Sequence, residues 1–192
     1  MKSSNNFCNQ HNEPLSMDLK VLVRHYIQNH RSNSELKIFE KSSSFSEALE
    51  KASMAINDKG KRFDHQRRLP SESLKESKES LFKIMTLLNA SKDFAELHDL
   101  IKKTLDEVCG VGELFYYDTA LRLGAFLKLF PECVHLHRGT RDGAKALGLN
   151  WQANTLDPKI FPPPIQKLSP HEIEDFLCIY KKRLKGDSNG HA

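Results

Sequence analysis

The sequence predicts an all-α protein, a bundle of about seven or eight helices arranged around a hairpin between two of them. Apolar residues recur at every third or fourth position in several segments, the pattern of a helix with one buried face. Serine and glutamate residues three positions apart mark two helix starts. Six of the nine glycines fall within residues 108–149, where they separate helical segments at the centre of the predicted fold.

The composition is typical of a soluble globular domain. Charged residues make up 28% and hydrophobic residues 39% of the 192 residues. We expect one helical domain over residues 17–185, with 17–70 as an alternative separate N-terminal lobe, and disordered tails at 1–16 and 186–192. No run approaches the roughly 18 apolar residues of a membrane span, and residues 1–16 lack the apolar core of a signal peptide. The sequence therefore predicts a cytoplasmic protein without a membrane partner.

Four amphipathic helices are predicted in the first part of the chain. Their ranges are 18–29, 44–57, 71–89 and 92–109, and each places apolar side chains along one face. A short segment at 35–40 has the length of either a helix or a strand. The residues predicted to cap these helices are Ser44, paired with Glu47, and then Ser71 and Ser91.

The helix predicted at 113–130 is apolar on nearly all sides, which indicates a central position in the core. Pro131 ends it, and a shorter helix is predicted at 140–147. An extended segment follows at 151–167. The last helix runs to about residue 184 and begins at a second capping box, formed by Ser169 and Glu172.

The hairpin Gly110-Val111-Gly112 connects the helix at 92–109 to the helix at 113–130. Two glycines permit a sharp turn and a close approach to a partner molecule. The unpaired amides at the start of the next helix favour an anion, so a phosphate suits this site. A tight turn between two core helices explains the same pattern without any ligand.

The stretch around this hairpin resembles a known family. The helix end and the hairpin have the sequence Leu105-x-x-Val108-Cys109-Gly110-Val111-Gly112. An apolar helix follows, and then a histidine-containing segment, Val134-His135-Leu136-His137. The stretch ends with Ala146-Leu147-Gly148-Leu149. This order of motifs is similar to the helix-hairpin-helix DNA glycosylase superfamily. The resemblance covers residues 105–149 and implies that the hairpin binds a DNA backbone.

The same stretch departs from that superfamily at its catalytic positions. His135 stands where the family has a catalytic Asp, and Glu113 follows the hairpin where bifunctional members carry a Lys. Tyr116 stands where an Ala is usual. Because an imidazole does not replace the carboxylate that stabilises a cationic sugar, the resemblance implies DNA binding without base excision, and an enzyme is the less favoured hypothesis.

Polar residues beside the hairpin form a candidate pocket for a phosphate or nucleotide: Asp118, Arg122, His135, His137, Arg138 and Arg141. Asp118 lies within the apolar helix, where a buried carboxylate needs a partner such as Arg122, Arg141 or a backbone amide. The alternative is structural. Asp118 and Arg122 would form an (i, i+4) pair, and Arg138 and Arg141 would be solvated.

A basic segment at 59–68, KGKRFDHQRR, precedes the helix predicted at 71–89. His65, Arg67 and Arg68 in this segment are candidates for contacts with phosphates and sugars. The apolar residues that flank them are expected to fix the segment to the core. A solvated charged surface is the alternative.

No cofactor and no metal are expected, because the chain has no motif for either. Cys8 and His11 form a C-x-x-H pair, but no second pair follows at zinc-finger spacing. A nucleophilic pair of His135 with Cys109 or Cys133 is a minor alternative. The cysteines, with Cys178 as the fourth, are expected to be reduced and partly buried.

The leading hypothesis is a protein that binds a nucleic-acid backbone, and the resemblance favours DNA. The residues expected to bind it are Gly110, Gly112, Arg67, Arg68, Arg138 and Arg141, with His65, Arg122 and His137 as further polar candidates.

Two alternatives come from other functional classes. One is an enzyme that acts on a phosphate- or ribose-containing substrate through Asp118, His135 and Arg141. The other is a structural subunit that docks a protein partner through the segment Phe161-Pro162-Pro163-Pro164, which favours polyproline geometry.

Overall fold

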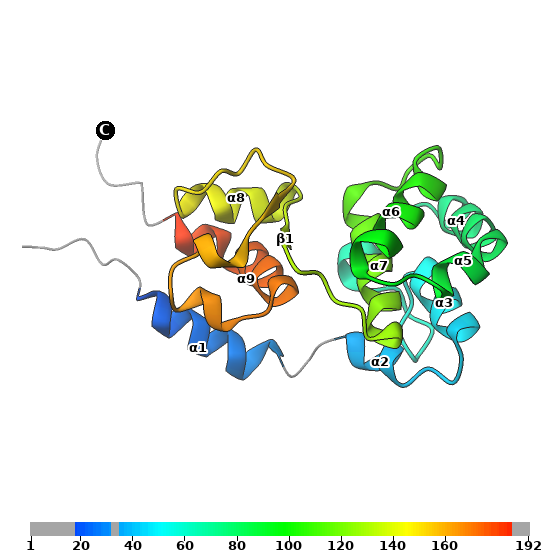
Figure 1. Ribbon diagram of the computed structural model, residues 1–192, viewed down its shortest axis with the longest axis horizontal. Helices are drawn as coiled ribbons and strands as arrows, with labels where there is room; N and C mark the ends of the chain where they lie inside the picture. Colours follow the sequence, from blue (N-terminus) through cyan, green and yellow to red (C-terminus); the bar gives the residue numbers. More distant parts are fainter. Residues whose placement is uncertain (1–17, 32–34, 186–192) are drawn as a thin grey trace, which may run out of the picture.

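The computed structural model describes residues 18–31 and 35–185 and confirms the predicted all-α class. Nine α-helices lie in these residues, together with short 3-10 turns and one two-stranded antiparallel sheet. The helices form two lobes side by side, each with its own hydrophobic core (Figure 1). The predicted tails at 1–16 and 186–192 lie outside the described residues.

The larger lobe, which we call the inserted lobe, contains the central part of the chain. Its core joins fully buried leucines from four helices, Leu49, Leu74, Leu97 and Leu123. Its helices are α2 (Leu36–Glu40), α3 (Phe45–Ser53), α4 (Ser71–Lys83), α5 (Met85–Asn89), α6 (Phe94–Leu105) and α7 (Glu113–Leu127).

The second lobe, which we call the terminal lobe, combines the first helix with the last part of the chain. Tyr26 from the first helix is buried against Phe176 from the last, with ring centroids 6.0 Å apart. The hydrophobic core therefore does not divide at residue 70, because the first helix packs with the C-terminal elements. The elements are α1 (Leu19–Asn29), β1 (Val134–His135), α8 (Arg138–Ala146), β2 (Thr155–Leu156), the 3-10 turns Pro158–Ile160 and Ile165–Lys167, and α9 (Pro170–Leu184).

The predicted capping box at Ser169 is confirmed, the one at Ser44 is confirmed only in its first half because Glu47 accepts from the Ser43 amide instead, and the two lone serine caps are wrong. Ser44 Oγ accepts from the Glu47 amide at 3.2 Å, and Glu172 accepts from the Ser169 amide at 2.8 Å. Pro70 rather than Ser71 precedes α4, and Asp93 rather than Ser91 caps α6. The Asp93 carboxylate is the better acceptor, since it carries a negative charge at the positive helix end.

Four predicted helices are shorter than expected. The helix predicted at 44–57 ends at Ser53, and the helix predicted at 92–109 ends at Leu105. The segment 71–89 breaks at Ile84 into α4 and α5. The apolar helix ends at Leu127 instead of continuing to Pro131, because Lys128 adopts a left-handed conformation with φ 63°. The Leu129 amide then donates to the Gly124 carbonyl at 2.8 Å, and a side chain at Gly124 would clash with the Leu129 carbonyl oxygen.

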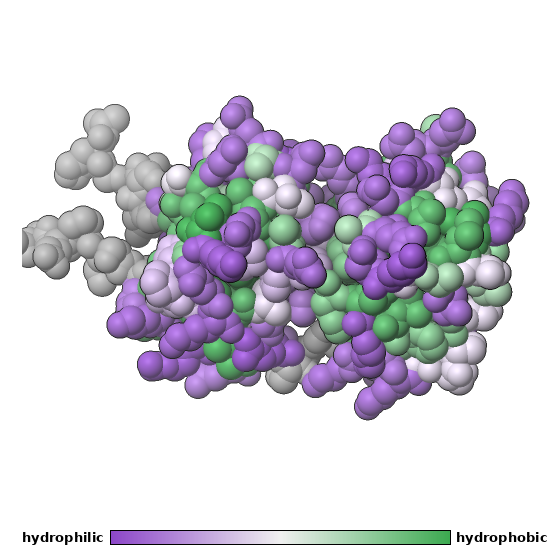
Figure 2. Space-filling view, viewed as in Figure 1, coloured by the Kyte–Doolittle hydropathy of each residue, from purple (hydrophilic) through white to green (hydrophobic). Residues whose placement is uncertain are grey.

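Hydrophilic residues cover most of the face seen in Figure 2, and hydrophobic residues show through in patches on both lobes. Within residues 18–31 and 35–185, no helix has the length and apolar content needed to cross a membrane.

Candidate functional site

A polar cavity of about 720 Å³ lies between the two lobes. The inserted lobe contributes Asp118 and His65 to its lining, and the terminal lobe contributes His137, Glu174 and Asp175. We call it the interlobe cavity. Ionisable groups from both lobes therefore meet in one cavity.

On the α7 side of the interlobe cavity, Asp118 is held by two residues from the basic segment. Gln66 Nε2 donates to Asp118 Oδ2 at 2.7 Å, and His65 Nε2 lies 3.0 Å from the same oxygen. The Asp118 side chain is 13% exposed, so one edge remains open to the cavity. The hydrogen bond to Asp118 raises the pKa of His65 against the opposing effect of burial.

Behind this pair, Arg122 is fully buried and fixes Gln66. Its guanidinium donates to Gln66 Oε1 at 2.7 Å and to Glu35 Oε1 at 3.0 Å. The ring of Phe63 lies beneath it, with 4.3 Å between the guanidinium carbon and the ring centroid. The expected partners of Asp118 are therefore wrong: the side chain of Gln66 stands between Asp118 and Arg122, and Arg122 pairs with Glu35 instead.

On the α9 side of the interlobe cavity, Glu174 is 9% exposed. His137 Nε2 lies 2.6 Å from Glu174 Oε1, the distance of a close ion pair, although the ring N–H does not point along a good hydrogen bond. Burial raises the pKa of Glu174, the His137 contact opposes this, and the charge of Asp118 adds to the increase. The charge of Asp118 therefore acts on Glu174 across the cavity.

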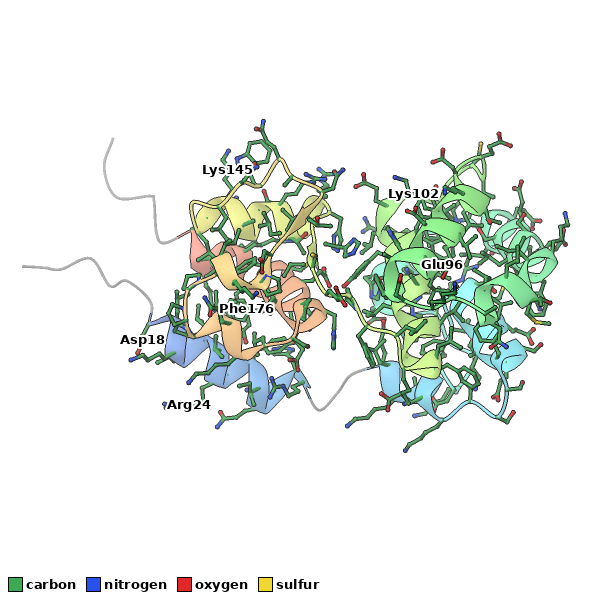
Figure 3. All side chains as sticks on the ribbon, viewed as in Figure 1. Asp18, Arg24, Glu96, Lys102, Lys145 and Phe176 are labelled. Carbon is green, nitrogen blue, oxygen red and sulfur yellow. The ribbon has the colours of Figure 1, made fainter. Side chains whose placement is uncertain are left out.

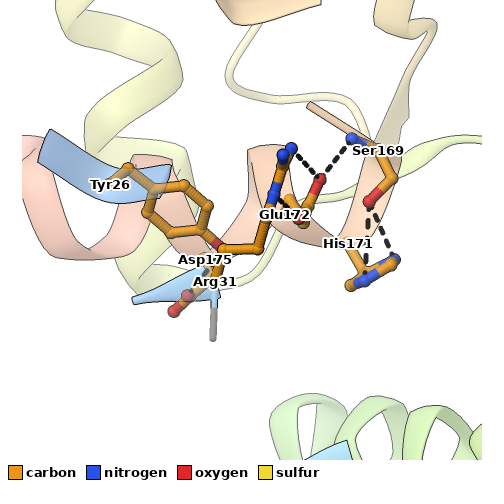
Figure 4. Close-up of polar contacts among 6 residues, drawn as sticks. All are labelled: Tyr26, Arg31, Ser169, His171, Glu172 and Asp175. Carbon is orange, nitrogen blue, oxygen red and sulfur yellow. Dashed lines mark hydrogen bonds and ion pairs between the residues drawn. The ribbon is translucent and has the colours of Figure 1, made fainter. Parts of the chain in front are cut away.

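Asp175 and Glu172, also on α9, connect this side to α1 (Figure 4). Tyr26 Oη donates to Asp175 at 3.0 Å, and burial raises the pKa of this carboxyl group. Arg31 donates two hydrogen bonds to Glu172, at 2.5 and 3.0 Å. The end of α1 is thereby tied to the first turns of α9 at the edge of the interlobe cavity.

The start of α8 lies close to α9, and this contact brings two cations to the interlobe cavity. A side chain at Gly139 would come within 2.8 Å of Cys178 Sγ and 3.4 Å of Lys181 Nζ, so glycine permits the close approach. Arg138 and Lys181 both line the cavity. Positive charge therefore lines the terminal-lobe side of the cavity.

Two residues of the predicted catalytic set do not line the interlobe cavity. The His135 ring packs against His98 and Tyr117, with centroids 5.0 Å away in each case. Burial lowers the pKa of His135 to about 4. Arg141 donates to the carbonyls of Trp151 and Ala153 at 3.1 and 2.9 Å, where it holds the segment after α8. Neither His135 nor Arg141 therefore lies with Asp118 in this cavity.

The hairpin lies next to the end of the basic segment, in the inserted lobe. Gly110 has φ +86°, and a side chain there would meet Ser73 Oγ at 2.7 Å and Pro70 Cγ at 3.2 Å. Gly112 has an extended backbone, with nothing within 4 Å of an added Cβ. Arg67 and Arg68 are exposed on the same segment as Pro70. The hairpin and two predicted arginines are therefore neighbours, whereas Arg138 belongs to the other lobe.

Two of the cysteines differ from the prediction that they are partly buried, and a third agrees with it. Cys109 and Cys133 are exposed, because both lie in the loops that flank α7, while Cys178 on α9 is partly buried. Cys8 lies outside the described residues. Among residues 18–31 and 35–185, no three His, Cys, Asp or Glu side chains are grouped to hold a metal ion.

Sequence reasoning identified Asp118, His65 and His137 but missed Glu174 and its neighbours. A signal was present, since Glu174 lies three residues before the buried Leu177 and next to the buried Ile173 on α9. A carboxylate at the edge of an apolar stripe requires a partner or a raised pKa.

No known protein family matches this chain, and no curated protein or solved structure is significantly similar to it. The resemblance to the helix-hairpin-helix glycosylases therefore rests on residues 105–149 alone.

Proposed function

We propose that the interlobe cavity is the active site of an enzyme that acts on a phosphate- or ribose-containing substrate by general acid–base chemistry. One observation carries this proposal: Asp118 and Glu174 line the same cavity from opposite lobes, in unlike environments. Asp118 accepts hydrogen bonds from side chains, whereas burial raises the pKa of Glu174. Carboxyl groups that are held by unlike neighbours are suited to different roles in one reaction.

Glu174 is suited to donate a proton to a leaving group, since its raised pKa favours the protonated form. Asp118 is suited to act as the second carboxylate, because Gln66 and His65 hold its side chain in a fixed position at the cavity. An ionised carboxylate stabilises positive charge that develops on a sugar ring, or accepts a proton from water. Both roles require a substrate that spans the cavity from one lobe to the other.

The cations on the terminal lobe support a phosphate group as part of the substrate. Arg138 and Lys181 line the interlobe cavity beside the first turn of α8. Leu114 and Ile179, from opposite lobes, are 38% and 41% exposed at its edge and offer apolar contacts. A molecule with an apolar ring, a sugar and a phosphate would match these three kinds of surface.

The test is hydrolysis of 4-nitrophenyl ribofuranoside and of AMP, followed by absorbance and by phosphorus NMR. Asp118→Asn and Glu174→Gln should each lower the rate by at least about 100-fold, the usual contribution of an acid or base group. Arg138→Ala combined with Lys181→Ala should weaken the binding of AMP more than that of the ribofuranoside.

Matched controls separate this effect from a change in net charge. Asp58→Asn and Glu79→Gln remove the same charges from exposed positions on the inserted lobe and should leave the rate unchanged. No turnover and no binding of either probe by the native protein would exclude this substrate class. Rates equal to the native rate in both cavity variants would exclude the assigned roles.

A second function, binding of a nucleic-acid backbone, is supported by the hairpin. Gly110 lies against Pro70 and Ser73, and the exposed Arg67 and Arg68 stand three and two residues before Pro70 in the chain. Glu113 opposes this function, because its carboxylate at the start of α7 repels a phosphate.

A titration with duplex and single-stranded DNA at several salt concentrations tests this second function. Arg67→Ala combined with Arg68→Ala should weaken binding and lower its salt dependence. Gly112→Ala adds a Cβ in open space and should leave stability unchanged, while it obstructs close approach of a phosphate. Absence of binding at low salt would remove nucleic acid as a partner.

A further inference from the structure

A second cavity, of about 480 Å³, lies on the terminal lobe away from the residues of the proposed active site. One side is α1, from Lys20 to Gln28, and the other is the segment Pro163, Pro164 and Lys167. We call it the α1 groove. Between Lys20 and Gln28 the helix rises about 12 Å, enough to contact several residues of an extended or helical peptide.

The floor of the α1 groove is apolar and belongs to the folded core. Val23 is 4% exposed and therefore recessed, and Ile27 is partly buried beside it. Phe161 is buried in the core of the terminal lobe and is not available to a partner as the sequence suggested. It instead anchors the proline segment, whose restricted backbone keeps the groove formed in the absence of a ligand.

The rim of the α1 groove carries only positive charge. Lys20 and Arg24 lie one turn apart on α1, and Lys167 stands on the opposite side. No Asp or Glu lines the groove, and none of the three cations forms an ion pair within residues 18–31 and 35–185. Arg24 projects outward from α1 (Figure 3). Cations on both sides of an apolar floor match an apolar side chain flanked by carboxylates.

We propose that the α1 groove binds an acidic segment of a partner protein, with an apolar side chain on Val23 and Ile27 and carboxylates on the rim. The concave shape favours a protein over a membrane surface, because a protruding side chain reaches the recessed Val23 and a flat bilayer does not. The apolar floor disfavours a nucleic-acid backbone, whose phosphates would meet only the rim. This interaction is independent of the interlobe cavity.

The test is fluorescence anisotropy with a labelled peptide that has a central Leu-Phe pair flanked by three glutamates on each side. The native protein should bind this peptide but not the versions in which serines replace the Leu-Phe pair or lysines replace the glutamates. Lys20→Glu combined with Arg24→Glu should weaken binding by at least about tenfold, since like charges would face the peptide. Because both side chains are exposed, the variant should fold, which circular dichroism checks.

Lys83→Glu combined with Lys102→Glu is the matched control, with the same change of charge at exposed positions on the inserted lobe. This control variant should bind the peptide with an affinity within about twofold of the native value, because salt screens the attraction between distant charges. Equal weakening by the two pairs of substitutions, or no peptide binding at low salt, would overturn the proposal. Binding of vesicles of phosphatidylcholine and phosphatidylserine that is lost with Lys20→Glu and Arg24→Glu would assign the groove to a membrane instead.

Discussion

The two sides of the interlobe cavity present carboxylates in opposite ways. On the α7 side, Asp118 receives hydrogen bonds from His65 and Gln66, and the buried Arg122 holds Gln66 in place. On the α9 side, the Glu174 side chain is 11% exposed, close to the 13% of Asp118, and it has one close partner, His137. Two side chains of the basic segment hold Asp118, whereas burial raises the pKa of Glu174. The difference shows that two acids in one cavity can be held by unlike neighbours.

The largest expected effect comes from removing Arg122, whose hydrogen bonds to Gln66 and Glu35 form the network behind Asp118. Arg122→Met should lower the free energy of unfolding by about 3 kcal/mol, because it leaves Gln66 and Glu35 without their buried partner. Urea unfolding measures this loss. Arg68→Met, an exposed arginine on the same segment, should change stability by less than about 0.5 kcal/mol. Equal effects of the two substitutions would show that the α7 side does not depend on Arg122.

The α9 side depends instead on close helix packing. Gly143→Ala should destabilise the protein by about 2 kcal/mol, since overpacking of a tight contact costs roughly 1–3 kcal/mol. The added Cβ would lie 2.6 Å from the Leu177 carbonyl oxygen. Gly112→Ala is the control, with open space around the added atom. Thermal unfolding of the two variants compares them, and an unchanged melting temperature for Gly143→Ala would contradict the α8–α9 contact.

The raised pKa of Glu174 predicts how stability depends on pH. The folded protein holds this proton to higher pH than the unfolded chain does, so the free energy of unfolding falls as pH rises through the raised pKa. The Glu174→Gln variant has no proton to lose at this position, so its free energy of unfolding should not show this decrease. Its stability relative to the native protein should therefore be greater at high pH than at low pH. Unfolding measured from pH 4 to pH 8 tests the sign, and a parallel pH dependence in the two proteins would reject it.

The smallest effect is local to His65. Asp118→Asn should lower the pKa of His65, because the hydrogen bond that raises it is lost while burial continues to lower it. In the native protein, the stability from this pair is present below the unfolded pKa and is lost as pH rises through the raised value. NMR titration of the imidazole protons measures the shift, with His135, near pKa 4, as an internal reference that should not change.

Much of the helical framework could be predicted from the sequence, but fewer of the residues of the candidate site could. The apolar stripe of Phe94, Leu97, Ile101, Leu105 and Val108 is buried as its spacing predicts. Candidate site residues could be chosen only by type and by distance along the chain. His135 and Arg141 were chosen with Asp118 on that basis, yet their side chains contact other rings and loop carbonyls. The sequence does not show which neighbour will pair with a charged residue or pack against an aromatic one.

The sequence by itself determined the helical class, the buried stripes, the Ser44 cap and the capping box at Ser169. These features depend on residues within one or two turns of one another, so their spacing is sufficient to encode them. The tertiary structure alone decided that α1 joins the terminal lobe and that Asp118 meets His65 and Gln66, 53 and 52 residues away. The physical reason is that helical periodicity specifies which face is buried but not the helix or loop that covers it.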